Sequence, residues 1–335
     1  MKLLSIVIPT YNRNEVLRRN LPILMRQLTS NVELMILDNA SPRPVAQDIA
    51  VILSEYPDHP VQVVRHRVNL GASANILRSF EIANALWLWI LGDDDVVTDT
   101  AVHDILETIA ACPDSMFINF STSTMRQQGL RLRSFDTRGL SEFVSRLDLT
   151  GNINFMSVGI WHAPSVLPNL RWAYHFAYSM SPTFALLLPS LGAMGRCHFS
   201  AIALVDTVTT ADAATKWRFR DFIIGWNTIL EFPMSRVERK ALAKKMYSWH
   251  SPENVCVYFL ADAAIRGGDG HFFNLAARRV GPYVSAFARL RFALYRPLFW
   301  SPQSSWPLVA AAVRLAVKFK LKGVDLSDIV DRAKH

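Results

Sequence analysis

Residues 86–95 read Leu-Trp-Leu-Trp-Ile-Leu-Gly-Asp-Asp-Asp, and this stretch decides the fold that the sequence predicts. Its apolar half predicts a strand buried on both faces, as in a parallel sheet covered by helices. The strand ends at Gly92, and three carboxylates follow it. Adjacent ionised side chains repel one another, so the cluster favours a site for a hard divalent cation. A solvated acidic turn is the alternative that charge alone leaves open.

Apolar runs of the same kind alternate with helical patterns through the first 125 residues. The predicted strands are Leu3–Pro9, Glu33–Asp38, Val61–His66, Leu86–Leu91 and Met116–Phe120. The predicted helices between them are Asn14–Gln27, Val45–Glu55, Ala72–Ala85 and Thr100–Ala111. This alternation is typical of an α/β fold with a Rossmann-like, mostly parallel sheet flanked by helices.

Candidate site residues, most of them polar, lie at or just after the ends of the first four predicted strands. They are Pro9, Thr10, Tyr11 and Arg13, then Asp38, Asn39 and Ser41, then Asn69 and Gly71, and last the acidic triplet Asp93, Asp94 and Asp95. Open α/β sheets bind ligands at this rim. The chain has no glycine-rich loop of the dinucleotide or P-loop type, which argues against a nicotinamide cofactor and against ATP hydrolysis. Amides and hydroxyls suit the edge of a base, and a cation on the triplet suits a diphosphate.

These motifs, with their spacing, resemble the family 2 glycosyltransferases with a GT-A fold. The matching stretches are Ser5–Arg13 (SIVIPTYNR), Asp38–Ser41 (DNAS), Asn69–Gly71 (NLG) and Gly92–Asp95 (GDDD). Within the family, the tryptophan-rich strand followed by Gly-Asp-Asp-Asp most resembles the same region in one branch. That branch includes abequosyltransferase-type transferases and other transferases of bacterial surface polysaccharides. The resemblance covers about the first 125 residues and departs from the family at Gly92, where relatives usually carry an aspartate.

The resemblance implies a nucleotide-sugar site that uses Mn²⁺ or Mg²⁺. Its residues for the donor would be those of the first three loops together with Asp93, and its metal ligands would be Asp94 and Asp95. The donor's sugar–phosphate bond breaks through an oxocarbenium-like transition state, so the departing diphosphate needs a cation and the acceptor hydroxyl needs a base. Family members usually invert the anomeric centre, and their base is often in a Glu-Asp pair, which residues 150–230 lack.

Asp206 and His162 are the candidate bases that remain, although a lone histidine is more often structural than catalytic. The segment between Gly151 and Leu191 is rich in aromatic rings, amides and hydroxyls, which are the groups that contact sugars. Trp161 and His162 are therefore candidate acceptor contacts. An aromatic core in a helical subdomain is the other reading of the same pattern.

The C-terminal part of the chain is basic and aromatic. From His271 to Val324 there are nine lysines and arginines and no aspartate or glutamate, within a chain of net charge +8. This composition favours contact between residues 271–324 and an anionic membrane surface. No nucleic-acid-binding motif accompanies it, so nucleic acid is not expected as a partner. An ordinary helical subdomain with an aromatic core is the alternative.

The sequence thus predicts three parts: a nucleotide-sugar-binding half at 1–125, an acceptor-binding half at 126–230 and a mainly helical region at 231–335. The expected activity is metal-assisted hexosyl or deoxyhexosyl transfer to a glycan or lipid-linked glycan. A non-catalytic nucleotide- or glycan-binding protein is the rival reading. No apolar run is long enough to span a bilayer, and the three scattered cysteines suit a reducing compartment and form no metal pattern. We expect a cytoplasmic protein, peripheral on the inner face of the membrane.

Overall fold

The computed structural model describes residues 2–59, 61–148, 150–206, 225, 227–247, 271–283 and 285–295. The chain divides into two compact units, Met1–Thr209 and Thr210–His335. The first unit holds the sheet and the predicted site, and the described part of the second is helical.

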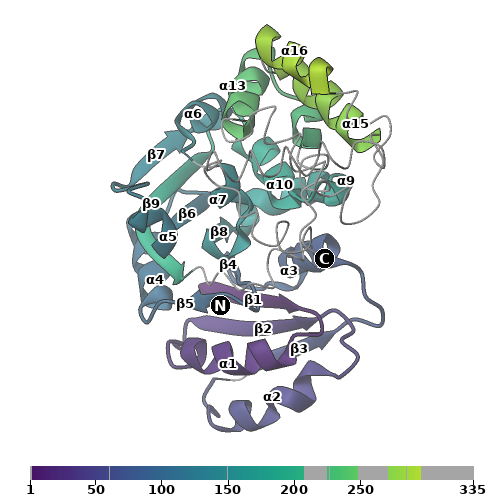
Figure 1. Cartoon of the computed structure of the whole chain (residues 1–335). Coiled ribbons are helices and arrows are strands. Elements are labelled where there is room, and N and C mark those ends of the chain that lie inside the picture. Colours follow the sequence, from purple (N-terminus) through teal and green to yellow (C-terminus); the bar gives the residue numbers. More distant parts are fainter. Residues whose placement is uncertain are drawn as a thin grey trace. The chain divides into compact units, whose positions relative to one another are not determined.

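A nine-stranded mixed sheet forms the centre of the first unit (Figure 1). Its strands are β1 (Leu4–Thr10), β2 (Val32–Asp38), β3 (Val61–Arg65), β4 (Trp87–Ile90), β5 (Val96–Val97), β6 (Phe117–Thr122), β7 (Phe135–Arg138), β8 (Gly159–His162) and β9 (Arg196–Asp206). Their order is β3-β2-β1-β4-β8-β6-β9-β5, with β7 paired to β9. All five predicted strands are present, each shifted by one or two residues at most at either end.

The first four strands run parallel, as predicted, and β8 then enters antiparallel between β4 and β6. The sequence pattern gave no strand at residues 159–162, so β8 is a correction to the predicted topology. A strand of four residues inside an aromatic segment has too little alternation to be told from a helix. β8 joins β1–β4 to β6 and β9 in one continuous sheet.

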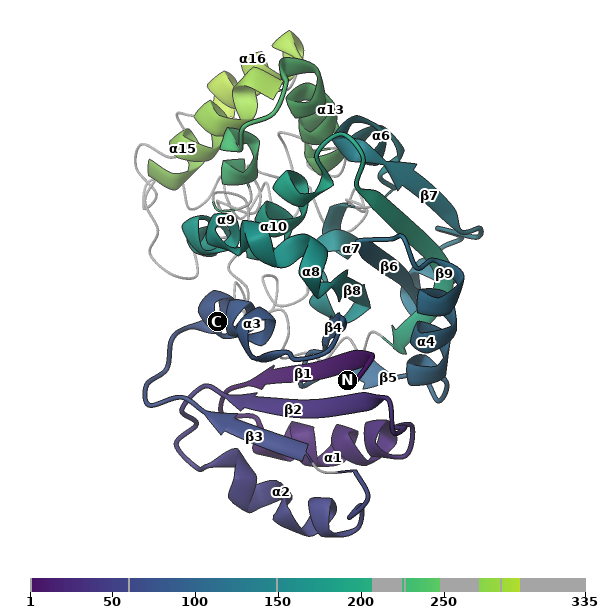
Figure 2. The ribbon, with the colours of Figure 1, turned by 180° about the vertical axis from the view of Figure 1, so that it is seen from behind.

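Helices cover both faces of the sheet. The helices of this unit are α1 (Asn14–Met25), α2 (Val45–Ser54), α3 (Ala72–Ile82), α4 (Ala101–Ala111), α5 (Ser123–Gln127), α6 (Gly139–Arg146), α7 (Thr150–Asn154), α8 (Ala163–Val166), α9 (Leu170–His175) and α10 (Pro182–Leu191). Short 3₁₀ turns lie at Met156–Val158, Leu167–Asn169 and Ala177–Ser179. Figure 2 shows α1 and α2 beside β1–β3, with α3 on the other side of those strands.

The parallel strands are buried on both faces because helices lie on both sides of them. All seven residues of β1 are buried, and the same is true of all four residues of β4. Leu4, Ile6 and Ile8 pack in one cluster with the apolar faces of α1, α2 and α4, whereas α3 contacts β1 and α9. Such double burial is what makes these strands read as unbroken apolar runs rather than as alternating ones.

The described part of the second unit contains a 3₁₀ turn at Thr228–Glu231, α13 (Arg236–Tyr247), α15 (His271–Val280), a 3₁₀ turn at Gly281–Tyr283 and α16 (Ala286–Tyr295). Ser235 and Glu238 cap the start of α13 reciprocally, since each side chain accepts the other residue's backbone N–H. Among the described residues, no helix has both the length and the apolar character that crossing a membrane requires.

Candidate functional site

The acidic triplet that follows β4 lies against the loop that follows β1. The Thr10 hydroxyl donates to Asp93 Oδ2 at 2.6 Å, and Arg13 Nη1 donates to Asp93 Oδ1 at 2.8 Å. The same Arg13 nitrogen lies 2.7 Å from Asp94 Oδ2. The Asp93 side chain is 7% exposed and that of Asp94 is 46% exposed. Asp93 is therefore fixed to the β1 loop, whereas Asp94 faces solvent.

Asp95 points back toward the sheet and meets Ser157, a residue that no motif in the sequence identified. The Ser157 hydroxyl donates to Asp95 Oδ2 and accepts the Gly92 N–H at 2.8 Å. The Ser157 carbonyl in turn accepts the indole N–H of Trp89 at 2.8 Å. A Cβ on Gly92 would lie 2.5 Å from Asp95 Oδ2 and 3.2 Å from Ser157 Oγ. Glycine at position 92 thus leaves the space that the Asp95 carboxylate occupies.

Burial and mutual repulsion act on the acidic triplet. Burial raises the pKa of Asp93, although its hydrogen bonds from Thr10 and Arg13 oppose the rise. Burial also raises the pKa of Asp95 to about 6; the bond from Ser157 opposes this shift, and the charges of Asp94 and Asp93 add to it. Three carboxylates held this closely favour the binding of a positive charge beside them. The Arg13 guanidinium supplies one such positive charge.

The loop after β2 is organised around Asp38, which is fully buried. Its Oδ1 accepts the Ser41 N–H at 2.8 Å, and its Oδ2 accepts the Val45 N–H at 3.3 Å and a bond from the Arg65 guanidinium. Although burial alone would raise the pKa of Asp38, these hydrogen bonds hold it below its usual value. Both oxygens are used within the protein, so Asp38 shapes the loop rather than offering a free edge to a ligand.

Further hydrogen bonds join the loops that follow β1, β2 and β3. Ser41 Oγ accepts the Asn12 N–H at 2.9 Å, and Asn39 Nδ2 donates to Asn69 Oδ1 at 2.9 Å. Asn69 Oδ1 also accepts the Gly71 N–H at 2.8 Å. The predicted residues of the first four loops therefore lie at one edge of the sheet. Asn39 and Ser41 are buried, and Tyr11, 43% exposed, is the aromatic side chain of these loops that faces solvent.

The donor set of the triplet fits a hard divalent cation. Carboxylate oxygens are the ligands that Mg²⁺ and Mn²⁺ favour, and three of them follow one another here. Both oxygens of Asp93 bond to Thr10 and Arg13, which leaves Asp94 and Asp95 as the residues that would hold the ion. Arg13 would then share Asp94 with the cation, because both positive charges are drawn to the same carboxylate.

The two predicted bases lie at opposite ends of the sheet's strands. Asp206 ends β9 and pairs with Val96 of β5, directly after the triplet, and it accepts a hydrogen bond from Ser123. His162 instead pairs with Trp87 at the start of β4 and lies 2.7 Å from Ser165 Oγ. The four-residue step from Trp87 to Leu91 spans about 13 Å of strand. His162 is therefore remote from the triplet, and its predicted roles as base and acceptor contact do not fit this position.

Trp161 is part of the core. Its side chain is 1% exposed and lies between two phenylalanines, with ring centroids 5.4 Å from Phe80 and 4.3 Å from Phe117. A ring enclosed in this way has no free face for a sugar. The predicted acceptor contact at Trp161 is therefore not supported, and the aromatic-core reading fits this residue.

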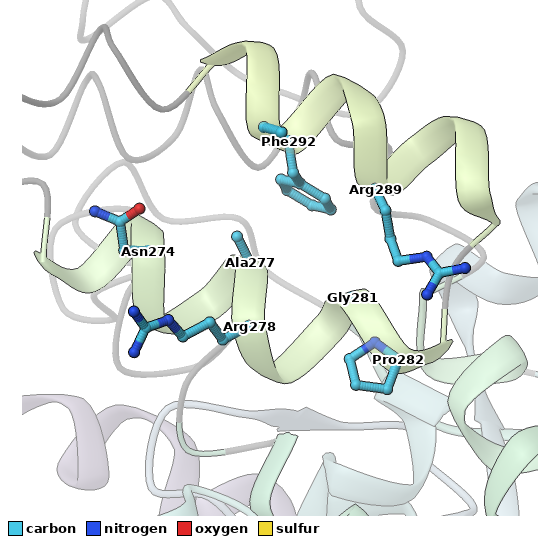
Figure 3. A pocket seen from close by; sticks show the side chains of 8 residues that line it. Asn274, Ala277, Arg278, Gly281, Pro282, Arg289 and Phe292 are labelled. Atoms are coloured by element: carbon cyan, nitrogen blue, oxygen red, sulfur yellow. The ribbon is translucent and has the colours of Figure 1, made fainter.

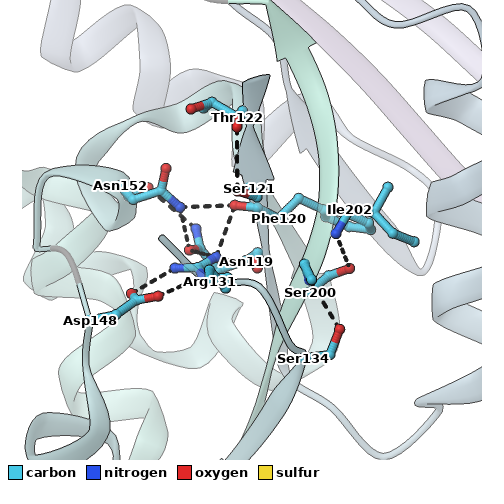
Figure 4. A network of polar contacts seen from close by, with 11 residues as sticks. Asn119, Phe120, Ser121, Thr122, Arg131, Ser134, Asp148, Asn152, Ser200 and Ile202 are labelled. Carbon is cyan, nitrogen blue, oxygen red and sulfur yellow. Dashed lines mark hydrogen bonds and ion pairs between the residues drawn. The ribbon is translucent and has the colours of Figure 1, made fainter. Parts of the chain in front are cut away.

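A buried polar network holds the segment that delivers Ser157 (Figure 4). Arg131, whose side chain is fully buried, donates to both carboxylate oxygens of Asp148 at 2.7 and 2.8 Å and to Asn119 in the middle of β6. Asn152 of α7 donates to Asn119 Oδ1 at 2.7 Å and to the Phe120 carbonyl at 2.8 Å. These bonds hold Asp148 and Asn152 against β6, and Ser157 follows five residues after Asn152.

Residues 5–157 match the family described as Glycosyl transferase family 2. A stretch of 108 residues is 38% identical to the abequosyltransferase RfbV of Salmonella typhimurium and covers 32% of each chain. A stretch of 116 residues is 30% identical to an uncharacterized glycosyltransferase of Haemophilus influenzae and covers 35% of this chain and 37% of that protein. The matched part spans about a third of the length of these curated relatives.

Solved GT-A structures share the fold over most of the chain. TarS residues 1–349 of S. aureus, in complex with UDP-GlcNAc, gives a TM-score of 0.59 at 14% identity and covers 92% of both chains. The mannosyltransferase PcManGT of Pyrobaculum calidifontis, in complex with GDP-Man and Mn²⁺, gives 0.56 at 13% identity and covers 94% of this chain and 86% of that one. The predicted GT-A fold is confirmed.

Proposed function

We propose that this protein transfers a monosaccharide from a nucleoside-diphosphate sugar to a glycan or lipid-linked glycan, because residues 5–157 match glycosyl transferase family 2 and the chain has a GT-A fold. The observation that carries the proposal is the contact of Thr10 and Arg13 with Asp93 beside the exposed Asp94. It joins the nucleotide loop and the acidic triplet into one site. The similarity to an abequosyltransferase supports a hexosyl or deoxyhexosyl donor and a role in bacterial surface polysaccharide synthesis.

The donor binds along the rim of β1, β2 and β3 in this proposal. Tyr11 stacks on the base, since its ring is exposed at the loop after β1. The loop backbone after β2 is held in place by Asp38, Asn39 and Ser41, which position the loop and do not contact the donor themselves. Arg13 reaches the diphosphate, because a guanidinium matches phosphate oxygens and already lies beside the triplet.

Asp94 and Asp95 hold Mn²⁺ or Mg²⁺ in the proposed enzyme. When bound, the cation neutralises charge that develops on the departing diphosphate. Ser157 orients the Asp95 carboxylate, and Thr10 with Arg13 orients Asp93. The similar structure of the mannosyltransferase PcManGT, which is in complex with GDP-Man and Mn²⁺, supports the use of a divalent cation.

Asp206 is the described residue that best suits the general base. Its backbone pairs with Val96, one residue after the triplet, and its side chain is exposed. A carboxylate at this point would take the proton of an acceptor hydroxyl as that hydroxyl attacks the anomeric carbon. Direct attack from the face opposite the diphosphate inverts the anomeric centre, which is the outcome proposed here.

The second unit is proposed to bring the enzyme to a lipid-linked acceptor at the inner face of the cytoplasmic membrane. Arg278 of α15 and Arg289 of α16 line a cavity of about 410 Å³, and Phe292 points into it (Figure 3). On α16, Phe287, Leu290 and Leu294 are 68%, 57% and 67% exposed. An apolar stripe beside arginines is typical of a helix at an anionic membrane surface. The rest of the predicted 271–324 surface lies outside the described residues.

The test is hydrolysis and transfer with the purified full chain. A panel of nucleoside-diphosphate sugars is incubated with Mn²⁺, with or without a lipid-linked glycan, and release of the nucleoside diphosphate is measured. We expect one donor to be turned over, and we expect Asp94→Asn to lower turnover at least about 100-fold, as loss of one charge-stabilising group does. We expect this variant to keep the native fold, because the Asp94 side chain is 46% exposed.

Asp58→Asn is the matched control, since Asp58 is an exposed carboxylate in the segment before β3. It should leave turnover unchanged. Equal turnover by the native protein and Asp94→Asn would refute the metal role. Donor binding by the native protein with no turnover of any donor in the panel would favour a non-catalytic binding protein instead.

A further inference from the structure

Three side chains with metal-binding atoms meet at the other end of β9, apart from the acidic triplet. They are Cys112 after α4, Asp136 of β7 and His198 of β9. One sulfur, one carboxylate oxygen and one ring nitrogen all lie within 4.8 Å of one another. The three residues come from separate parts of the sequence, which is why no metal pattern is visible in the spacing of the cysteines.

Backbone pairing fixes two members of this Cys112–Asp136–His198 cluster. Asp136 and His198 are direct partners in the antiparallel pair of β7 and β9, and His198 Nδ1 lies 3.0 Å from Asp136 Oδ1. The His198 side chain is 14% exposed, whereas that of Asp136 is 54% exposed. The cluster therefore has one side enclosed by the protein and one side open to solvent.

The third member is held by the end of α4. The Cys112 N–H donates to the Thr108 carbonyl at 2.9 Å, and the Cys112 carbonyl accepts the Ser115 N–H at 3.0 Å. The residue before β6 is also bonded to β9, since the Met116 N–H donates to the Arg196 carbonyl at 2.9 Å. The thiol is thus placed beside β9 by backbone bonds on both sides of it.

We propose that Cys112, Asp136 and His198 bind a Zn²⁺ ion. Thiolate, imidazole and carboxylate are the three ligand types that zinc takes, at about 2.0–2.3 Å. A tetrahedral ion with such bonds holds its ligands about 3.3–3.8 Å apart. Ligand atoms at the 4.8 Å limit would close by about 1 Å, and His198 Nδ1 and Asp136 Oδ1, now 3.0 Å apart, would separate slightly. Thiolate and carboxylate together balance the charge of the ion, and the exposed side leaves room for water as the fourth ligand.

The ion would join the end of α4 to β7 and β9. Without it, burial and the charge of Asp136 raise the pKa of the Cys112 thiol, while the nearby Arg196 opposes that rise. Zinc binding displaces the thiol proton. His198 and Asp206 lie eight residues apart on one strand, roughly 25 Å, so this ion is separate from the proposed donor cation.

The test uses Co²⁺ and Zn²⁺ with the purified full chain. Cobalt bound by a thiolate gives a sulfur-to-metal charge-transfer absorption that oxygen ligands do not give, so the acidic triplet is silent in this measurement. We expect the native protein to show the band with one equivalent of Co²⁺ and to lose it when Zn²⁺ is added. Calorimetry with Zn²⁺ should give one site that Asp94→Asn retains.

Cys112→Ser and His198→Gln should each weaken zinc binding at least about 100-fold, because loss of even an outer partner of a metal ligand weakens binding about 10–100-fold. Asp114→Asn is the matched control: this carboxylate is 76% exposed in the same loop and pairs with Arg196. Cys256→Ser controls for the cysteine outside the described residues. Both controls should bind zinc as the native protein does.

Far-ultraviolet circular dichroism and donor turnover confirm that each variant is folded. Absence of the charge-transfer band in the native protein would refute the site, and so would a band that persists in Cys112→Ser. In either case Asp136 and His198 form a hydrogen-bonded pair beside a thiol that binds no metal.

Discussion

At the scale of single residues, Gly92 leaves the space that the Asp95 carboxylate occupies. A side chain there would meet the Asp95 carboxylate at 2.5 Å, and Asp95 bonds to Ser157 in the space that glycine leaves. The short stretch after β4 is thus built around Asp95 and Ser157 rather than around an acidic residue at position 92. An aspartate at position 92 would therefore displace Asp95 rather than add a ligand.

We predict that Gly92→Asp lowers donor turnover about 100-fold, because displacing Asp95 by about an ångström misplaces a metal ligand. Steady-state assays at several Mn²⁺ concentrations measure the effect, and the Mn²⁺ needed for half-maximal turnover should rise. Gly151→Asp is the control, since a Cβ at Gly151 meets no atom within 4 Å. Higher turnover in Gly92→Asp than in the native protein would contradict this account of Gly92.

Asp38 gives a prediction for stability. The pKa of Asp38 is lower in the folded protein than in the unfolded chain. The carboxylate's contribution to the free energy of unfolding is therefore fully present above the unfolded pKa of about 4, and it is lost as the pH falls through the folded pKa. Asp38→Asn leaves two backbone donors and Arg65 without a charged acceptor. We expect a loss of about 2–3 kcal/mol in the free energy of unfolding near neutral pH, reduced because Arg65 is partly exposed.

Urea unfolding at about pH 7 and about pH 3 measures that difference, which should shrink at the lower pH. Asp58→Asn should change the free energy of unfolding by less than about 0.5 kcal/mol at either pH. An Asp38→Asn deficit that is constant between the two pH values would mean that the lost contribution is not the carboxylate's charge.

At the scale of elements, Arg131 links β6 to the segment that leads to Ser157. Its guanidinium is fully buried and bonds to Asn119, Phe120 and Asp148. We predict that Arg131→Met lowers the free energy of unfolding by about 3 kcal/mol, because it removes a buried guanidinium together with its hydrogen bonds to Asn119, Phe120 and Asp148. Arg131 does not touch the triplet, so turnover should fall only through the loosened Ser157 segment.

The comparison for this prediction is Arg18→Met. Arg18 pairs with Glu15 at 4.0 Å on the exposed side of α1, and such surface pairs contribute about 0–1 kcal/mol. Thermal or urea unfolding of both variants measures the contrast. Similar losses in the two variants would show that the Arg131 network does not hold β6 and α7 together.

The sequence predicted the elements whose apolar pattern is long and the loops that follow them. β1, β2 and β4 are buried on both faces, and helices such as α1 show their apolar positions at helical spacing. β5 and β8 were missed because two or four residues carry no period, and because β8 gains its partners only from strands far away in the chain. β9 was missed because its burial is irregular along its length.

The same limit applies to the candidate site. Thr10, Arg13 and Asp93 were predicted to converge, and their hydrogen bonds join them. Ser157 was missed, since it lies 62 residues beyond its partner Asp95 and forms no motif with it. Burial decided against Trp161, and strand register decided against His162. Register and burial are properties of the folded chain that residue type does not encode locally.

At the scale of the whole molecule, the second unit supplies a prediction about attachment. The exposed apolar residues of α16 lie beside arginines. We therefore expect the full chain to bind vesicles that contain anionic lipid and not to bind vesicles of neutral lipid. Replacing Phe287, Leu290 and Leu294 with serine should lower the bound fraction at least about tenfold, since apolar area and charge both contribute to interfacial binding. Sedimentation with vesicles measures it.

Donor hydrolysis in solution is the internal control for that variant and should stay at the native rate, because the donor site lies within the first unit. The matched variant replaces Val51, an exposed apolar residue of α2 in the first unit, with serine. Unchanged vesicle binding in the triple variant would show that α16 is not the attachment surface.

The antiparallel β8 strand has a consequence for how the chain is made. β4 and β6 emerge first during synthesis, yet neither pairs with the other, and both bond to residues 159–162. Until about 40 further residues have left the ribosome after β6, both strands present unpaired backbone edges that are rich in Trp, Ile and Phe. During the interval between the synthesis of β6 and that of β8, a nascent chain of this protein therefore exposes strand edges through which it can aggregate.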